Sequence, residues 1–213
     1  MNAPRRPTWR EIAAMPGRRL VVAVPVADEV NAAVIRLVDA LRAPSGGPAA
    51  RVRRRDVRWV RLDGLHLTLR FLGPTEEPGI PAVTEAVRRA AAAHESFAMT
   101  IDGGGAFPGP DRPRTLWLGV TDGAGELGGL AATLDRELVG AGWPPSERPF
   151  RAHLTLARTD GVAGAAEVAR RLQDAAAGLA LRSTVDRIVL FESITGGGPA
   201  RYEPLEVAPL GSS

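Results

Sequence analysis

The tetrapeptide HLTL occurs twice in this chain, at residues 66–69 and again at 153–156. The chain has only three histidines, and the two copies contain two of them, His66 and His153. Imidazole has an unperturbed pKa of about 6.5, so near neutral pH one ring can accept a proton while another donates one. Two histidines at equivalent positions of a repeated motif therefore predict general acid–base catalysis.

Each motif lies in an apolar run of strand length, 65–72 for the first copy and 150–158 for the second. Side chains alternate between the two faces of a strand. The reactive faces are thus expected to carry one histidine, one threonine and one arginine each: His66, Thr68 and Arg70, and Arg151, His153 and Thr155. A regular strand would turn Arg158 to the opposite face from His153.

Two imidazoles, two hydroxyls and two guanidiniums match the needs of a phosphodiester. Hydroxyls can donate to the non-bridging oxygens, and arginine can offset charge that develops at phosphorus. A metal site is the weaker alternative, because two histidines without a nearby carboxylate or cysteine supply too few ligands. Neither a metal nor another cofactor is expected. The alternative of two ordinary amphipathic strands is disfavoured, because the copies hold two of only three histidines.

Composition excludes other chemistries. The chain has no cysteine, so disulfides, zinc–thiolate sites and cysteine nucleophiles are ruled out. All 27 basic residues are arginine, and the formal net charge is +3. The base composition of the genome is one explanation of the missing lysine. The run 51–61 holds six arginines, and either contact with a phosphate backbone or a solvated loop would explain it.

No run approaches the roughly 20 apolar residues of a membrane span, and no signal peptide is evident. A cytoplasmic protein is expected, and a monomer, since no dimerisation heptad is present. Residues 1–17 are rich in proline and arginine and are expected to form a flexible extension. Residues 18–208 are expected to form a single domain.

The remaining pattern mixes strands and helices. Residues 19–26 read as a strand and 28–42 as a helix with apolar residues at helical spacing. The runs 57–62 and 65–72, separated by Asp63 and Gly64, read as a hairpin. Strands that follow one another directly indicate an α+β fold with much antiparallel pairing. The two halves echo each other, which predicts two similar lobes facing across a cleft.

Two further residues have open roles. His94 ends an alanine-rich helix, where a cation suits the helix dipole, and is interpreted as structural. Phe107, in a loop rich in glycine and proline, would either pack or stack on a base.

The motif pair resembles the two-histidine (2H) phosphoesterase superfamily, and more narrowly its RNA 2′,3′-cyclic phosphodiesterase branch, the LigT-like 2′-5′ RNA ligase family. The resemblance spans about residues 19–207. Beyond the tetrapeptides it rests on RLVVAVPV, WVRLDGLHLTLRFLG, GAFPGPDRPRTLWLGV, RPFRAHLTLAR, VDRIVLFES and RYEPL. Ala152 departs from the family, which usually has proline before the second histidine.

The resemblance implies two α+β lobes with largely antiparallel sheets, related by a pseudo-twofold axis around a central cleft. It implies an enzyme that hydrolyses a terminal 2′,3′-cyclic phosphate of RNA to a 2′-phosphomonoester without metal, and whose reversal would join RNA ends by a 2′-5′ bond without ATP. His66 would be the proton donor and His153 the proton acceptor. Phosphate would be bound by Thr68, Thr155, Arg151, Arg70 and Arg158.

Substrates would be RNA ends or small cyclic nucleotides, with no obligatory protein partner. Two alternatives stay open. One is a module that grips RNA ends without turnover, and the other is a 2H enzyme for a non-RNA cyclic phosphate or a 2′-5′ oligonucleotide. The two imidazoles could also exchange roles with the direction of reaction.

Overall fold

The computed structural model describes residues 16–43, 57–161, 163–196 and 198–211. The strands in these ranges are β1 (Arg18–Pro25), β2 (Val57–Trp59), β3 (His66–Thr75), β4 (Phe97–Phe107), β5 (Thr115–Val120), β6 (His153–Thr159), β7 (Leu181–Val185), β8 (Arg187–Ile194) and β9 (Arg201–Pro209). The α-helices are α2 (Asp28–Arg42), α3 (Ile80–Ala92), α4 (Ala124–Gly140) and α5 (Ala163–Ala176). Two short 3-10 helices are η1 (Leu62–Gly64) and η2 (Glu77–Gly79).

The strands form one sheet in the order β7-β4-β5-β6-β3-β1-β8-β9, with β2 paired to β6 outside this path. All pairs between the named strands are antiparallel. The two motif strands, β6 and β3, are neighbours at the middle of this order, with three further strands beyond each. The sequence-predicted lobes therefore meet along the strands that carry HLTL.

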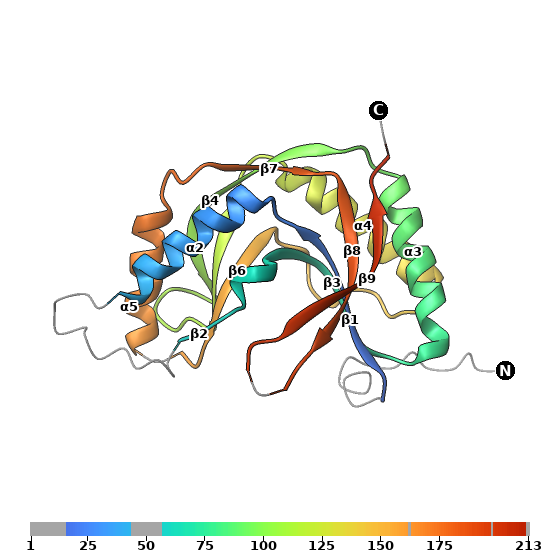
Figure 1. Cartoon of the computed structure of the whole chain (residues 1–213), viewed down its shortest axis with the longest axis horizontal. Helices are drawn as coiled ribbons and strands as arrows, with labels where there is room; N and C mark the ends of the chain where they lie inside the picture. Colours follow the sequence, from blue (N-terminus) through green and yellow to red (C-terminus); the bar gives the residue numbers. More distant parts are fainter. Residues whose placement is uncertain (1–15, 44–56, 162, 197, 212–213) are drawn as a thin grey trace.

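The helices cover the two halves of the sheet separately. Helices α3 and α4 pack on each other and on β3, β8 and β9, whereas α5 packs on β4 and α2 contacts α5 and β7. Figure 1 shows the two helix pairs at opposite ends of the molecule. This arrangement confirms the predicted α+β class with antiparallel pairing and two similar halves.

Helix α2 has the bounds that its sequence predicts. Its buried residues recur at helical spacing, namely Val30, Val34, Val38 and Leu41. Two acidic residues in its first turn and an arginine in its last complement the helix dipole. The apolar stripe faces the core and the polar face is left to solvent.

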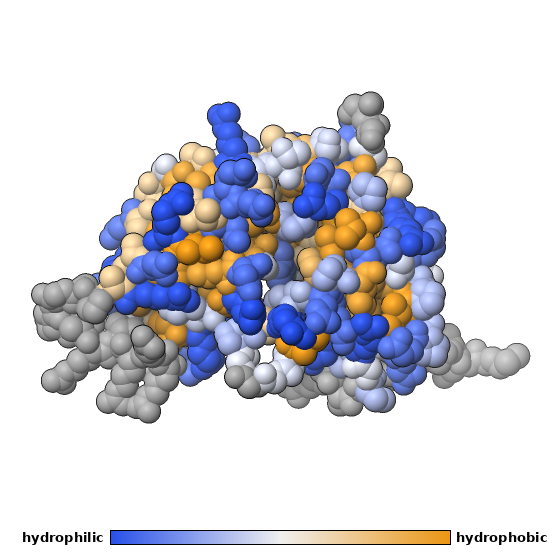
Figure 2. Space-filling view, in the orientation of Figure 1, coloured by the Kyte–Doolittle hydropathy of each residue, from blue (hydrophilic) through white to orange (hydrophobic). Residues whose placement is uncertain are grey.

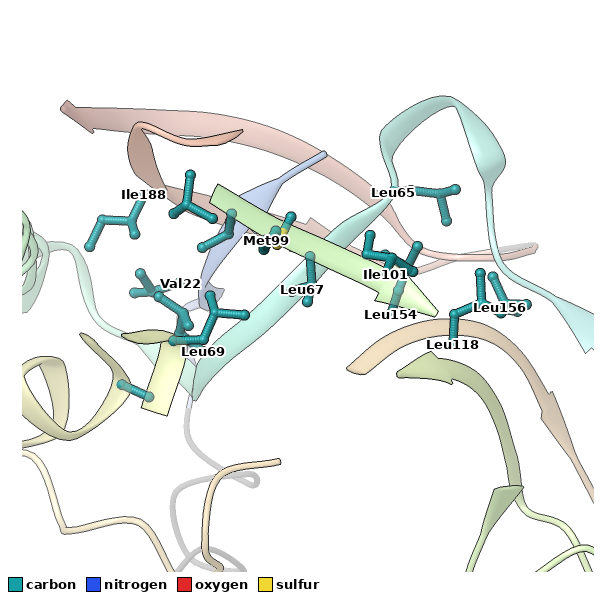
Figure 3. Close-up of a cluster of buried hydrophobic side chains, with 14 of the residues drawn as sticks. Val22, Leu65, Leu67, Leu69, Met99, Ile101, Leu118, Leu154, Leu156 and Ile188 are labelled. Atoms are coloured by element: carbon teal, nitrogen blue, oxygen red, sulfur yellow. The ribbon is translucent and has the colours of Figure 1, made fainter. Parts of the chain in front are cut away.

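Leucines of the motif strands lie at the centre of the core (Figure 3). Leu67 and Leu154 have no exposed surface and are register partners across the β3–β6 pair. Burying a leucine side chain fully contributes about 1.5–3 kcal/mol to stability. The outer surface is hydrophilic with separate apolar patches on the face shown in Figure 2. The motif strands thus anchor the fold with one face and leave the other for chemistry.

A β-bulge follows the threonine of each motif. Thr68 and Arg70 face consecutive residues of β1, so Leu69 is the extra residue in β3. Thr155 and Ala157 likewise face consecutive residues of β5. The burial sequence of the seven residues from each histidine is the same in both strands. A bulge reverses the alternation of faces for the residues that follow it, up to the next irregularity of the strand.

The predicted hairpin between 57–62 and 65–72 is wrong. Strand β2 pairs with the second half of β6, not with β3. The expected turn residues, Asp63 and Gly64, belong to the 3-10 helix η1, and Val60 still donates to Leu156 O at 2.9 Å. The chain therefore follows β6 before it turns into β3. Another difference concerns Phe107, which was predicted to lie in a loop but is the last residue of β4.

The predicted extension, 1–17, lies almost entirely outside the described residues, as do the first four arginines of the 51–61 run. The single domain over 18–208 stays a prediction. In the described part of the chain, no helix combines the length and the apolar character needed to cross a membrane.

Candidate active site

The register of the central strand pair brings the two motifs together. Leu67 lies opposite Leu154, so in antiparallel pairing His66 falls opposite Thr155 and Thr68 opposite His153. Directly opposed side chains on one face are about 5 Å apart at Cβ, and diagonal ones about 7–8 Å. The two histidines are such a diagonal pair. This spacing allows one imidazole on either side of a single phosphorus atom.

Each imidazole is oriented by the same local hydrogen bond. His66 Nδ1 is 2.9 Å from the carbonyl oxygen of Gly64, and His153 Nδ1 is 2.7 Å from that of Arg151. A carbonyl oxygen only accepts, so Nδ1 carries the proton in both neutral rings. The reactive nitrogen is therefore Nε2 in both: a base when neutral, an acid when charged.

The two rings differ electrostatically. Burial lowers the pKa of His66, opposed by its bond to Gly64. Burial also lowers the pKa of His153, with further lowering by the nearby guanidiniums of Arg158 and Arg151. These two guanidiniums disfavour the charged imidazolium form of His153, and they have no such effect on His66. The two arginines thus help to keep His153 neutral, the form in which a general base starts.

Arg158 lies on the same face as His153, contrary to the expectation from regular alternation. The bulge after Thr155 turns it there, and its guanidinium donates to Thr115 Oγ1 at 2.7 Å. The exposed Arg151 lies two residues before the first residue of β6, and its guanidinium carbon lies 4.8 Å from the centre of the Phe107 ring. Thr68 and Thr155 are partly exposed. These arginines and threonines therefore lie around His153.

Arg70 does not join them, and its predicted position on the reactive face is wrong. The bulge in β3 turns its side chain to the helix-covered side, where it is 6% exposed. Its Nε lies 3.2 Å from Asp135 Oδ1 of α4, and the guanidinium donates to Pro144 O. Burial lowers its pKa, opposed by Asp135 and Glu147. Phe71 takes the place on the reactive face and is 52% exposed.

Aromatic rings flank both histidines. Tyr202 meets the His66 ring edge-on with centroids 4.3 Å apart, and Phe191 lies 5.7 Å from it. Phe107 and Trp117 lie 5.1 and 6.5 Å from the His153 ring. Sequence reasoning did not connect Tyr202 and Phe191 with the site. Their runs belong to the family resemblance, but only strand pairing brings β8 and β9 beside His66.

Other candidates lie elsewhere. In the 51–61 run, Arg58 is paired with Asp160 and Arg61 with Asp63. His94 Nε2 lies 2.9 Å from Thr133 Oγ1 of α4, which agrees with its structural interpretation. Over the described ranges, no three or more His, Asp or Glu side chains form a group that could hold a metal ion.

Comparison with known proteins gives consistent matches. A family model described as the 2′-5′ RNA ligase superfamily matches residues 24–197. A protein of Methanothermobacter thermautotrophicus named RNA 2′,3′-cyclic phosphodiesterase is 31% identical over 196 residues, which cover 90% of this chain and 98% of that protein. A protein of the same name from Aeropyrum pernix is 41% identical over 105 residues, 49% of this chain and 58% of that protein.

Solved structures agree. The structure of Escherichia coli LigT complexed with 3′-AMP has a TM-score of 0.71 at 26% identity and covers 91% of this chain and 98% of that one. A structure described as a phosphoesterase has the same TM-score at 27% identity, covering 92% and 99%. These matches confirm the predicted resemblance and the prediction of an enzyme.

Proposed function

Since the chain belongs to the 2′-5′ RNA ligase superfamily, we propose that it hydrolyses the 2′,3′-cyclic phosphate at the end of an RNA to a 2′-phosphomonoester. The observation that carries the proposal is the register of β3 and β6, which makes the two histidines diagonal neighbours. Both half-sites come from one chain, so we propose that a monomer is active. Relatives named RNA 2′,3′-cyclic phosphodiesterase support the substrate class.

The reaction needs one proton accepted and one donated. His153 Nε2 accepts a proton from water as the water oxygen bonds to phosphorus. The bond from phosphorus to the ribose 3′ oxygen breaks, and His66 Nε2–H protonates that oxygen. The 2′ oxygen keeps the phosphate. His153 then releases its proton to solvent and His66 takes one up, which restores the starting protonation state of both rings.

The division of roles rests on the charges around each ring. Arg158 and Arg151 disfavour a positive charge on His153, which suits a base. In the described part of the chain only burial lowers the pKa of His66, and an approaching phosphate anion would favour its charged form. His66 is therefore the acid and His153 the base in hydrolysis.

The phosphate is bound by the groups around the rings. Thr68 and Thr155 donate to the non-bridging oxygens from positions opposite the histidines. Arg158 and Arg151 offset the charge that develops as water adds. Arg70 has no part in this contact, because it is ion-paired with Asp135 on the other side of the sheet.

Incubation with 2′,3′-cyclic AMP in excess EDTA tests the proposal directly. The expected product is 2′-AMP, formed at a rate that EDTA does not change. Chromatography against 2′-AMP and 3′-AMP standards identifies the isomer. Formation of 3′-AMP would contradict the assigned leaving oxygen. Binding without turnover would favour the RNA-end-binding module, and turnover of only non-RNA cyclic phosphates would favour a different 2H enzyme.

The pH dependence should be bell-shaped, since one ring must be neutral and the other charged. Burial lowers both pKa values in the free enzyme, so kcat/KM should be highest below the ordinary pKa of histidine, about 6.5. Bound phosphate opposes this effect, so kcat should be highest at higher pH. Initial rates in buffers of constant ionic strength measure both profiles.

Arg158→Gln tests the direction in which Arg158 shifts the pKa of His153. Loss of that cation makes His153 easier to protonate and raises its pKa. His153 then becomes neutral only at higher pH, so the acidic limb of the kcat/KM profile should shift to higher pH. The alkaline limb, which reports His66, should move less. A shift confined to the alkaline limb would reverse the assigned roles.

A further inference from the structure

Charged side chains continue the reactive face beyond the two motifs. Strand β2 replaces β3 as the neighbour of β6 there, and its register places Arg58 opposite Arg158. Directly opposed residues of an antiparallel pair point to the same face of the sheet. Arg58 therefore shares a face with Arg158 and His153. Asp160 lies on this face too, because both terminal nitrogens of Arg58 donate to its carboxylate, at 2.8 and 3.0 Å.

A third guanidinium lies beside this group. Arg114 Nε is 3.3 Å from the place that a Cβ would take at Gly161, the residue after Asp160. The hydrogen bonds from Arg58 lower the pKa of Asp160, and the charge of Arg114 adds to that lowering. Arg58, Arg114, Arg158 and Asp160 are all exposed to solvent, and we call them the basic cluster. Three guanidiniums and one carboxylate leave it with an excess of positive charge.

The basic cluster has room for a further anion. Like charges directly opposite each other in a sheet repel, and Arg58 and Arg158 are such a pair. Asp160 bonds to Arg58, whereas Arg158 donates to the neutral hydroxyl of Thr115 at 2.7 Å. A guanidinium carries five N–H groups, so the two bonds to Asp160 leave Arg58 with further donors. A phosphate between the two arginines would relieve their repulsion and accept from both.

The basic cluster lies on the side of the site to which the substrate's nucleoside is directed. Along β6 the order is His153, Thr155 and then Arg158, which follows Thr155 by roughly 10 Å along the strand. His66 lies opposite Thr155, between His153 and the basic cluster. In the proposed mechanism the 3′ oxygen leaves toward His66, so the terminal nucleoside lies there. Its 5′ oxygen carries the next phosphate of an RNA chain, which is thus directed to the basic cluster.

We propose that Arg58 and Arg158 bind the internal phosphate next to the cyclic end, so that the enzyme prefers an RNA chain to a cyclic mononucleotide. The proposal rests on the proposed function. Arg158 lies between the two phosphates, and its charge reaches back to His153. Arg58 lies farther out and contacts only the internal phosphate. This phosphate takes no part in bond breaking and only holds the chain in place.

The test compares two dinucleotide substrates with 2′,3′-cyclic AMP. Both are ApA with a terminal 2′,3′-cyclic phosphate, one with a normal internal linkage and one with an uncharged methylphosphonate linkage. The natural chain should show a kcat/KM about fivefold higher for the charged dinucleotide, the scale of one exposed ion pair. Arg58→Gln should lower this preference to less than about twofold. Both dinucleotides carry the same bases, so base stacking does not contribute to the preference.

Arg88→Gln is the matched control. The side chains of Arg58 and Arg88 are both 56% exposed, and Arg88 is likewise held by two hydrogen bonds, to Glu206. Arg88 belongs to α3, which packs on β8 and β9 in the other half of the molecule. Its variant should show the same preference for the charged dinucleotide as the natural chain.

Two results would overturn the phosphate site but leave the proposed function standing, provided that 2′,3′-cyclic AMP is hydrolysed. One is an equal kcat/KM of the natural chain for both dinucleotides. The other is a preference that Arg58→Gln leaves unchanged, or that Arg88→Gln lowers as much as Arg58→Gln does. Hydrolysis of none of the three substrates by the natural chain would instead refute the proposed function.

Discussion

Replacing His66 or His153 with alanine should lower kcat/KM for 2′,3′-cyclic AMP by about 10²–10⁴-fold in each case. That range is typical for the loss of one general acid or base. In the proposed mechanism both Nε2 atoms act on one phosphate, and the register of β3 and β6 makes the two histidines diagonal neighbours, so they are expected to act as a unit. The double variant should therefore lose little more than either single one, because losses within a catalytic unit are not additive.

His94→Gln is the matched control, since it changes the third histidine of the chain. His94 contacts Thr133 between α3 and α4, away from the motif strands. Its variant should keep kcat/KM within about threefold and affect only the unfolding temperature. Full activity in either His66→Ala or His153→Ala, with the fold intact by circular dichroism, would rule out the two-histidine mechanism.

Asp135→Asn should cost roughly 3 kcal/mol of unfolding free energy, the scale for removing one partner of a buried ion pair. Arg70 is 6% exposed, and its Nε lies 3.2 Å from Asp135. The amide oxygen of asparagine can still accept from Ser146 N, which bonds to Asp135 at 3.0 Å. The expected loss of unfolding free energy therefore reflects the missing charge of Asp135 and not a missing hydrogen bond to Ser146. Urea unfolding measured by fluorescence gives the value.

The substitution Arg70→Met tests whether Arg70 stabilises the fold or binds phosphate. Methionine matches much of the volume and removes the buried charge, so the double variant with Asp135→Asn should be more stable than Asp135→Asn alone. Asp135→Asn should keep kcat/KM for cyclic nucleotides below its unfolding temperature. A stable Asp135→Asn protein with a greatly raised KM would instead return Arg70 to the substrate-binding groups.

The repeated motifs make half of the candidate site predictable, because its histidines and threonines lie close together in the sequence. His66 and His153, with the threonines two residues later, follow from strand alternation over three residues. The regular alternation of side chains between the two faces fails after the threonine of each motif. The bulge residue Leu69 is an ordinary apolar residue, and nothing in its type distinguishes it from a regular strand residue. Arg70 and Arg158 were therefore assigned to the wrong faces.

Pairing between distant strands explains the other differences. The Asp63–Gly64 signal is a sound local indication of a hairpin, but β2 pairs with β6, which is distant in the sequence. The nearness of Tyr202 to His66 likewise depends on β1, β3, β8 and β9 lying in one sheet. Helix α2, whose stripe of valines needs only its own period, was predicted with its observed bounds.

The partner strands β3 and β6 also make enzyme activity a reporter of folding. Their leucine pair, Leu67 and Leu154, joins residues 87 apart in the chain, so neither half alone can hold both imidazoles. Contacts of such long range close late, because the intervening chain must first lose its freedom. Recovered turnover during refolding should therefore mark the final closure of the sheet, after the helices have formed.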